Sequence, residues 1–492
     1  MELPPDLLPS GSHALVLIDF KDQVASNQVD LKSRFLMKTL IALFFLLTSL
    51  SCLAQEKSFK QLRYDENYSY LAKDTTSDWY RNLKFNSVSK DNAAYFSFGG
   101  EARFQYFYYK NQDWGEAPED KDGFILARYL GHVDFHAGKH FRTFVQLQSS
   151  LAGGEADTPS PVDQNPLDLH QAFFDVSTTL SNTRKLTLRV GRQELSYGSQ
   201  RLVAVREAPN NRQSFDAAKI MYGSQNVKLD LFYSHYVFAK PNIFDDGFSD
   251  ATHFWGAYAV FNKIKVVSNF DIYYLGIRKK AVSFDDGSGT ETRHSVGARL
   301  WETTPAWQYD IEGLYQFGDF AASAISAWTM SVNVAYTFFH NKFKPQIGLK
   351  TEAISGDKTY NDSRLNTFNP LFPKGAYFGL AALIGPSNLV DAHPYIQFNL
   401  TKNLIFSSDY DLFWRMSRND GIYAVNSKLI YSGKVGTSKQ IGRQLGGALE
   451  YFPNKYLYFR QEFTWFNTGD YLKEAGPGKD ILMFGSTITF KF

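Results

Sequence analysis

Beyond residue 94 the chain alternates apolar and polar residues with a period of two. In the segment 96–106, for example, Phe98 and Phe104 fall on one side and Glu101 and Arg103 on the other. Successive side chains of a β-strand point to opposite faces, so this alternation is typical of strands with one apolar face. The pattern recurs in residues 125–137, 307–317, 326–338 and 404–414. The sequence therefore predicts an all-β protein.

The length and aromatic content of these segments indicate strands that cross a membrane. Many of them run for 10–14 residues, whereas strands of soluble proteins usually have about 5–6. Aromatic residues make up 16% of the chain and gather on the apolar faces and at the strand ends. A soluble β-sandwich also alternates, but aromatic girdles that flank an apolar band are the pattern of an outer-membrane barrel. We therefore predict a transmembrane antiparallel β-barrel.

The connections between strands alternate between short and long, and this gives the topology. Eight short turns are expected at 138–139, 178–185, 224–226, 262–263, 303–305, 340–341, 401–403 and 453–454. Nine long loops are expected at 110–123, 152–167, 196–213, 239–250, 278–291, 318–325, 355–391, 416–440 and 469–478, with 376–384 as part of a folded loop rather than a strand. These seventeen connections imply about 18 strands, with the short turns in the periplasm and the long loops outside the cell.

An export signal precedes the barrel. Met37 and Lys38 stand before the apolar run 39–47, and small residues follow up to Ala54, which is the pattern of a secretory signal peptide. We expect cleavage after Ala54, and lipidation of Cys52 is the alternative. An exported barrel of this kind belongs in the bacterial outer membrane, where lipid surrounds it.

The signal divides the chain into four parts. They are a start-site artefact or unstructured extension (1–36), the signal peptide (37–54), a periplasmic segment (55–94) and the transmembrane barrel (95–492).

Charge and cysteine content exclude several function classes. Lys and Arg number 52 and Asp and Glu 50, so the chain lacks the basic excess of a nucleic-acid binder. A single cysteine excludes an internal disulfide framework and a cysteine-based zinc site.

The C-terminal segment has the form of a closing barrel strand. In 481–492, Phe490 and Phe492 share the apolar face, and Thr489 and Lys491 share the polar face. An amphipathic last strand that ends in Phe is the signal that outer-membrane assembly machinery recognises. We therefore expect that machinery to be a partner.

Three short runs resemble a known family. They are residues 191–202 (GRQELSYGSQRL), 211–217 (NRQSFDA) and 368–373 (FNPLFP), the last followed by Tyr377-Phe378-Gly379. Together they resemble the alginate export family of bacterial outer-membrane barrels, over residues 90–492. The resemblance implies a monomeric 18-stranded porin that passes an anionic, alginate-like polysaccharide through an arginine-containing lumen.

Strand alternation and these runs give the candidate pore-lining residues. Alternation places charged side chains on the inward face: Arg103, Arg128, Arg142, Arg189, Arg299, Arg415, Arg460, Glu101, Asp134 and Asp310. The family-like runs add Arg192, Arg201 and Arg212, with a ligand or gating role. A polyuronate carries one carboxylate per sugar, and guanidinium offers it a planar, permanently charged fork. The alternative is that these arginines pair with acids on neighbouring strands and stiffen the barrel.

Two constellations raise the question of a metal site. His132, Asp134 and His136 share a strand face, but residues four apart on a strand lie too far apart for one ion, so ordinary lumen polarity is the main interpretation. Acids in the predicted loops, such as Asp245 and Asp246, could hold structural calcium through oxygen ligands. Polar turns explain the same residues more simply. We otherwise expect no cofactor.

The main functional expectation is a channel for an anionic polysaccharide or a small acidic solute, and not an enzyme. The alternatives are a general porin of little selectivity and an outer-membrane lipase or protease. A lipase needs a Ser/His pair on the lipid-facing side. His235 and His294 are the outward histidines that alternation identifies, and neither has an obvious serine partner.

Overall fold

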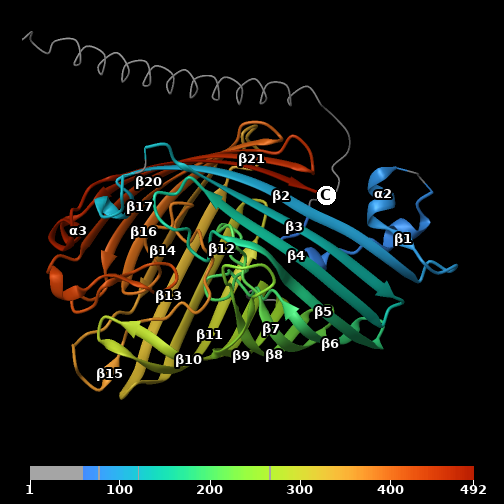
Figure 1. Ribbon diagram of the computed structural model, residues 1–492, viewed down its shortest axis with the longest axis horizontal. Helices are drawn as coiled ribbons and strands as arrows, with labels where there is room; N and C mark the ends of the chain where they lie inside the picture. Colours follow the sequence, from blue (N-terminus) through green and yellow to red (C-terminus); the bar gives the residue numbers. More distant parts are fainter. Residues whose placement is uncertain (1–58, 76–77, 120, 265–267) are drawn as a thin grey trace, which may run out of the picture. The chain divides into compact units, whose positions relative to one another are not determined.

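The computed structural model describes residues 59–75, 78–119, 121–264 and 268–492. The predicted extension 1–36, the signal peptide and its cleavage point lie outside these residues. The described residues form one closed antiparallel β-barrel of 18 strands (Figure 1). The predicted fold class and strand number are therefore confirmed.

Long strands make the barrel wall. Their bounds are β2 (Ala94–Lys110), β3 (Phe124–Ala137), β4 (Phe141–Gly153), β5 (Asn165–Ser181), β6 (Arg184–Gln193), β7 (Phe215–Gly223), β8 (Val227–Phe238), β9 (Gly247–Ile264), β10 (Ser268–Phe284), β11 (Gly287–Thr303), β12 (Trp307–Phe320), β13 (Ser323–Thr337), β14 (Gln346–Ile354), β16 (Leu389–Asn399), β17 (Leu404–Arg415), β20 (Gln440–Tyr451), β21 (Leu457–Thr468) and β22 (Ile481–Lys491).

Shorter elements lie before the barrel and in its loops. The strands among them are β1 (Asn86–Ser87), β15 (Arg364–Leu365), β18 (Ile422–Tyr423) and β19 (Leu429–Tyr431). The helices are α2 (Trp79–Lys84) and α3 (Asp470–Ala475), with 3-10 turns η1 (Arg63–Asp65), η2 (Ser69–Lys73), η3 (Gln112–Gly115) and η4 (Gly433–Val435). None of the helices in the described part of the chain is long and apolar enough to span a membrane.

The first and last barrel strands close the ring. β2 pairs antiparallel with β22, from Glu101 opposite Lys491 to Lys110 opposite Leu482. Pairing also continues across the two longest loops, because β14 pairs with β16 and β17 with β20. Each barrel strand thus has a partner on both sides, which is what a bilayer demands, since lipid offers no hydrogen bonds to a free strand edge.

Two of the loops expected to be long are tight hairpins. β10 ends at Phe284 and β11 begins at Gly287, and β12 ends at Phe320 and β13 begins at Ser323. The strands continue beyond the apolar band into a region with exposed charged residues such as Arg278. These polar strand ends have the composition of loops, which is why the sequence pattern predicted loops there. The segment 376–384 contains no strand, as expected.

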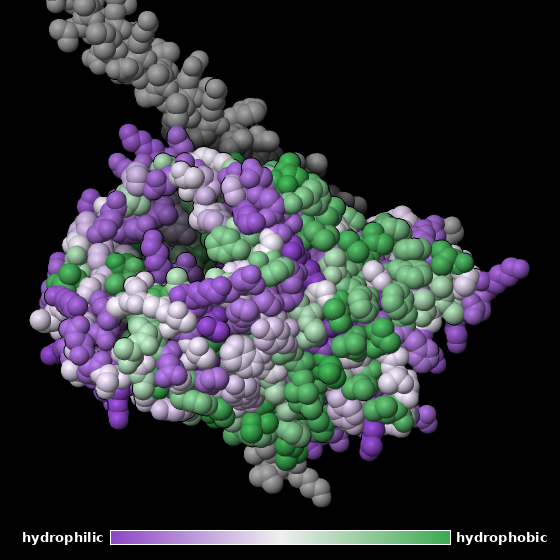
Figure 2. All heavy atoms as spheres, turned by 60° about the horizontal axis from the view of Figure 1, so that its bottom comes forward, coloured by the Kyte–Doolittle hydropathy of each residue, from purple (hydrophilic) through white to green (hydrophobic). Residues whose placement is uncertain are grey.

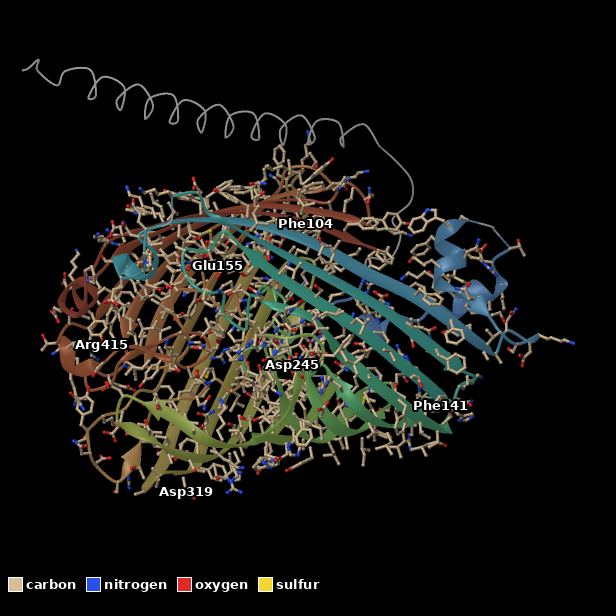
Figure 3. All side chains as sticks on the ribbon, in the orientation of Figure 1. Phe104, Phe141, Glu155, Asp245, Asp319 and Arg415 are labelled. Carbon is tan, nitrogen blue, oxygen red and sulfur yellow. The ribbon has the colours of Figure 1, made fainter. Side chains whose placement is uncertain are left out.

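Apolar and polar residues divide between the two faces of the wall as alternation predicts. Phe104 and Phe141 lie exposed on the outer side of β2 and β4 (Figure 3), whereas Glu101 and Arg128 are buried on the inner side. Hydrophobic side chains gather over one part of the outer surface, and hydrophilic ones over the end that carries the long loops, where the surface is hollowed (Figure 2). This arrangement gives lipid an apolar band to contact.

The barrel seam depends on the C-terminal residue. Phe492 N–H donates to Gly100 O (3.1 Å), and Gly100 N–H donates to Phe492 O (3.0 Å). The Phe492 ring lies over Gly100 so closely that a Cβ there would be 2.6 Å from the ring. The seam therefore continues to the last residue of the chain.

Deletion of Phe492 should lower the yield of folded barrel. It removes two seam hydrogen bonds, each with a net contribution of about 1 kcal/mol, and exposes strand edge to lipid. The measurement is the fraction of heat-modifiable protein in extracted outer membranes. Phe452→Ala, which removes an exposed aromatic side chain from a periplasmic turn, is the matched control and should leave that fraction unchanged. Normal assembly without Phe492 would contradict the seam argument.

Candidate functional site

Two extracellular loops fold back into the barrel and make its interior. They are the loop between β6 and β7 (194–214) and the loop between β14 and β16 (355–388). Ala204 N–H donates to Phe372 O (2.9 Å) and Phe372 N–H to Leu202 O (2.8 Å), so the two loops join like short strands. Residues of these two loops therefore occupy part of the lumen, which is not an empty tube.

An apolar cluster holds these loops against the wall. Val203 and Phe372 from the loops pack with Phe215 and Phe254, which point inward from β7 and β9. The Phe215 ring lies 5.0 Å and the Phe254 ring 5.1 Å from that of Phe372, both edge-on. Burial of aromatic residues of this size stabilises each contact and fixes where the polar loop residues lie.

Most of the predicted lumen arginines form ion pairs. Arg128 is fully buried and donates to Glu101 on the neighbouring strand (2.6 Å) and to Glu207 of the β6–β7 loop (2.7 Å). Other pairs of the same kind are Arg142–Asp134 (2.7 Å), Arg189–Asp175 (2.7 Å), Arg192–Asp216 (2.9 Å), Arg299–Asp310 (2.7 Å) and Arg460–Glu450 (3.4 Å). This geometry is that of the cross-strand alternative. A role of these residues in binding solute stays a prediction.

Two of the predicted arginines donate to backbone carbonyls. Arg103 donates to the carbonyls of Glu207 (2.6 Å) and Pro209 (2.9 Å) and so holds the β6–β7 loop to β2. Arg415 donates to the carbonyls of Ser438 (2.6 Å) and Gly436 (2.8 Å) in the loop between β17 and β20. Both guanidinium groups therefore fix loops to the wall.

The two arginines of the family-like runs that lie within the β6–β7 loop are also paired. Burial lowers the pKa of Arg201, but Glu352 and Glu312 outweigh it and hold that pKa well above its ordinary value. Burial likewise lowers the pKa of Arg212, and Glu194 and Glu207 raise it above the ordinary value. Both groups stay charged and neutralised by acids inside the lumen.

Sequence reasoning missed a buried pair on β11. Arg293 and Glu291 on β11 are both fully buried, with 2.5 Å between Nε and Oε1. Alternation along β11 could have identified Arg293 as inward. The expected loop at 278–291 obscured it, because β11 already begins at Gly287.

Three lumen cations have neither an ion pair nor a hydrogen bond from the side chain within the described residues: Arg206, Lys279 and Lys374. The ammonium groups of Lys279 and Lys374 lie over the rings of Phe372 and Tyr377, each 5.6 Å from the ring centroid. Burial, followed by the charge of Lys350, lowers the pKa of Lys374 to about 8. These three residues therefore carry positive charge that is not paired with an acid in the described residues.

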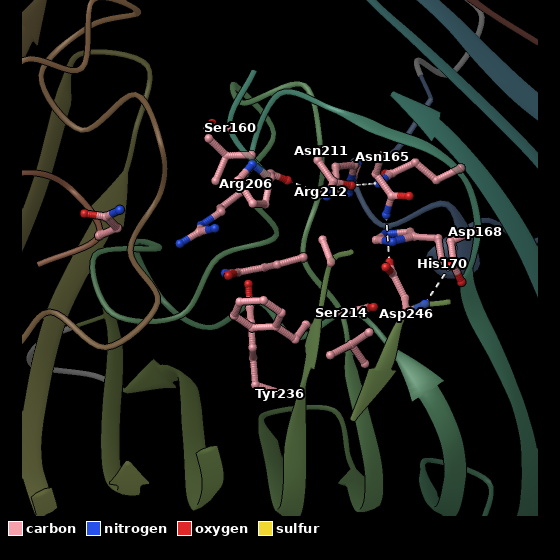
Figure 4. A pocket seen from close by; sticks show the side chains of 18 residues that line it. Ser160, Asn165, Asp168, His170, Arg206, Asn211, Arg212, Ser214, Tyr236 and Asp246 are labelled. Carbon is pink, nitrogen blue, oxygen red and sulfur yellow. Dashed lines mark hydrogen bonds between the residues drawn. The ribbon is translucent and has the colours of Figure 1, made fainter. Parts of the chain in front are cut away.

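Arg206 lies at a cavity of about 270 Å³ on the extracellular side of the lumen. The cavity lies between β5, the end of β8 and the β6–β7 loop. Figure 4 shows the Arg206 guanidinium and the Tyr236 hydroxyl extending into the same open space. Arg212, His170 and Asp246 also line the cavity. A guanidinium and a hydroxyl are hydrogen-bond donors that suit a carboxylate.

The candidate metal ligands lie differently from what the sequence suggested. Asp168 joins the predicted loop acids Asp245 and Asp246, with one oxygen of each within 4.8 Å of the others. His136 Nε2 lies 3.1 Å from the Asp134 carboxylate, which also forms an ion pair with Arg142. Structural calcium stays a prediction.

A third outward histidine was missed. His253 on β9 lies directly opposite His235 on β8. Its Nδ1 lies 2.8 Å from the Tyr233 hydroxyl, and His294 Nδ1 lies 2.7 Å from the Tyr274 hydroxyl. These side chains thus contact tyrosine where a lipase would need serine.

Carboxylates join two extracellular loops above the lumen, the loop 355–388 and the loop between β17 and β20. Asp357 N–H donates to Asp420 Oδ2 (2.7 Å), and Asp420 also accepts from Thr367 and Tyr423. Burial raises the pKa of Asp357 to about 7 and that of Asp420 to about 6. Asp357 Oδ2 is buried without a hydrogen-bond partner in the described residues. We call the two loops that are joined by Asp357 and Asp420 the loop cap. The raised pKa values mean that the packed arrangement of this loop cap is favoured when the two carboxyl groups are protonated.

Arg128→Ala should destabilise the barrel by about 3–5 kcal/mol, because it leaves Glu101 buried without its cation. The free energy of unfolding in detergent or liposomes measures the loss. Arg128→Ala combined with Glu101→Gln should recover part of it. Arg364→Ala, at an exposed loop arginine, is the control. An Arg128→Ala barrel as stable as the control would show that the pair contributes nothing.

The loop cap should loosen as pH rises. An acid with a raised pKa in the folded state favours the fold when protonated, so this stability is complete below about pH 4 and lost as pH rises to about 7. Proteolysis of the loop 355–388 should therefore be at least about tenfold faster at pH 8 than at pH 5, since one pKa unit corresponds to a factor of ten.

Asp357→Asn should remove much of this pH dependence, because the amide cannot ionise. Asp362→Asn changes an exposed carboxylate of the same loop and should retain the dependence. A cleavage rate that stays constant with pH in the unaltered protein would contradict the assignment.

Comparison with known proteins agrees with this architecture. OccK1 (OpdK) of Pseudomonas aeruginosa has a TM-score of 0.55 at 11% identity, over 81% of this chain and 98% of that one. OccD3 (OpdP) of the same organism has a TM-score of 0.54 at 12% identity, over 89% and 98%. A BenF-like porin from Pseudomonas fluorescens Pf-5 has 0.53 at 11%, over 81% and 98%. These likenesses show the fold. None of the curated protein sequences matches the chain.

The family model for alginate export matches residues 94–481, which is the barrel almost from its first strand to its last. That match spans well over half of the chain and includes the arginine-bearing loops of the lumen. The chain belongs to the alginate export family and is an outer-membrane channel.

Proposed function

We propose that this channel passes an anionic saccharide, such as an alginate-like polyuronate, or another acidic solute. The observation that carries the proposal is the set of three lumen cations without an acid partner in the described chain: Arg206, Lys279 and Lys374. The other lumen arginines are neutralised by carboxylates or held by carbonyls. Net positive charge in the lumen thus depends on a few identifiable side chains.

The three cations come from separate elements of the loops and the wall, so a solute would contact them one after another. Arg206 and Lys374 sit on the two loops that fold into the lumen, and Lys279 points inward from β10 among the buried residues Leu275 and Ile277. A low-dielectric wall focuses the field of such charges into the lumen. Few contacts per site let a polyanion bind and leave again, as conduction requires.

The cavity beside Arg206 supports a subsite for one carboxylate. The guanidinium has five N–H donors, and the Tyr236 hydroxyl beside the same space adds another. Arg212, bound to Glu194 (2.7 Å), helps to hold the loop in place. Arg206 therefore supplies charge at a position that buried pairs keep fixed.

The second candidate is a general porin of little selectivity. The many Arg–carboxylate pairs favour it, because they leave the lumen close to neutral. The two proposals differ in one measurable quantity, the ratio of anion to cation permeability. We expect no catalytic activity from this barrel.

Replacement of Arg206, Lys279 and Lys374 together by Ala should shift the reversal potential in planar bilayers toward cations. The anion-to-cation permeability ratio should fall by roughly threefold at low salt, and less at 1 M, where the Debye length is about 3 Å. Carboxylate-bearing oligosaccharides should block the unaltered channel more strongly than the variant.

The matched control removes three exposed positive charges at the periplasmic end of the barrel: Lys139, in the turn between β3 and β4, and Arg184 and Lys185, at the start of β6. It should leave the ratio nearly unchanged. A cation-selective unaltered channel would refute the acidic-solute proposal. An unselective one would establish the general porin instead.

A further inference from the structure

The first described residues of the chain occupy the periplasmic half of the lumen. Tyr64, in η1, is buried inside the barrel wall, where its ring meets those of Phe144 (6.0 Å) and Phe173 (5.4 Å) edge-on. The Arg189 guanidinium lies over the same ring, 4.3 Å from its centroid. Phe144, Phe173 and Arg189 all point inward from the wall, so Tyr64 fills space through which a solute would have to pass.

This segment also touches the loop that comes down from the extracellular side. Tyr64 O–H donates to Glu194 O (2.9 Å), and Gln200 Nε2 donates to Gln61 Oε1 (2.8 Å). Arg212 donates to Gln61 O (3.1 Å). The β6–β7 loop and the N-terminal segment thus meet inside the lumen.

The segment is attached to the wall at two further points. One is the turn between β20 and β21, where the Phe59 ring lies 6.1 Å from that of Tyr456, and the other is the barrel seam. Arg63 donates to Gly100 O (3.0 Å) and Phe492 O (2.7 Å), on the two strands of the barrel seam, and its Nε lies 2.9 Å from Glu66. These bonds use carbonyls at the barrel seam that lie toward the lumen. The strands keep their own pairing without them, so the segment can leave while the barrel stays closed.

A separate apolar cluster holds the next part of the chain. Tyr68, Leu71, Phe85 and Tyr95 pack together at the periplasmic end of β2. They share no member with the cluster of Tyr64, Phe144 and Phe173. Two contacts link the parts: the Tyr68 hydroxyl donates to Glu66 Oε2 (2.7 Å), and the Lys84 ammonium of α2 lies 5.5 Å from the centroid of the Phe59 ring. Release of residues 59–66 breaks these contacts but leaves the second apolar cluster intact, so the chain between the two clusters can act as a hinge.

We propose that residues 59–66 are a periplasmic gate that closes the lumen when Tyr64 is seated and leaves it when solute passes. This inference rests on the proposed channel function and adds its regulation. The gate closes the lumen from the periplasmic side and contacts the β6–β7 loop, which carries Arg201 and Arg206. Contact of a solute with that loop thus competes directly with the contacts of Gln61 and Tyr64.

The test fixes the gate by a reducible cross-link. The full-length chain with Gln61→Cys and Gln200→Cys carries Cys52→Ser, which removes the one native cysteine. A short bis-methanethiosulfonate joins the two thiols, and dithiothreitol releases them. Conductance in planar bilayers is read in both states, and mass spectrometry confirms the link.

The cross-linked channel should show low conductance, and reduction should raise it by at least about twofold as the polar lumen fills with water. The control pair, Gln461→Cys and Ser486→Cys, joins side chains 2.8 Å apart on the outer face of β21 and β22. Its conductance should be the same before and after reduction. Tyr64→Ser should raise the conductance without any cross-link, with heat-modifiability as the check on folding.

Absence of a cross-link between positions 61 and 200 would overturn the proposal, because the segment would then not lie in the lumen. Equal conductance of the linked and reduced states would overturn it as well. The failure of the proposed function is a separate result, since it appears in the sign of the reversal potential and not in the size of the conductance. A channel that opens on reduction but prefers cations would keep the gate and refute the acidic-solute proposal.

Discussion

The hydrogen-bond requirement of the backbone in lipid is the constraint on which the rest of this structure depends. Each unpaired N–H or C=O costs several kcal/mol there, so the sheet must close on itself. Here β2 and β22 close it, and Phe492 bonds Gly100 at the seam. Closing 18 strands creates an interior that is too wide for strand side chains alone to fill. The loops 194–214 and 355–388 and the segment 59–66 fill it from both ends.

The interior then has to accommodate buried charge. An isolated charge away from water is costly, and a nearby opposite charge compensates for it. Pairs such as Arg128–Glu101 and Arg293–Glu291 meet this demand and at the same time tie strands to strands and loops to the wall. The cations left over, such as Arg206, are few. Under the proposed function, the selectivity of this barrel would come from these few unpaired cations and not from a uniformly basic lumen.

Closure at the two ends has different chemistry. At the extracellular end, buried carboxylates such as Asp357 and Asp420 join loops, and their contacts depend on protonation. At the periplasmic end, the Tyr64 ring packs between the rings of Phe144 and Phe173, and the Gln61 side chain accepts a hydrogen bond from Gln200, so closure there relies mainly on packing. The β6–β7 loop contacts the periplasmic segment and the extracellular loop 355–388, which makes it the physical connection between the two ends.

The sequence by itself determined the wall of this protein. Alternation along a strand is local, so Glu101, Arg128 and Asp134 could be assigned to the inner face, and the turns gave the strand number. Family-like runs also identified Arg201 and Arg212. Only the tertiary structure decided which charges are neutralised, because a partner such as Glu207 comes from a loop that the periodicity does not place. It also decided that Tyr64 lies in the lumen, since a contact between residues 64 and 173 leaves no trace in either local pattern.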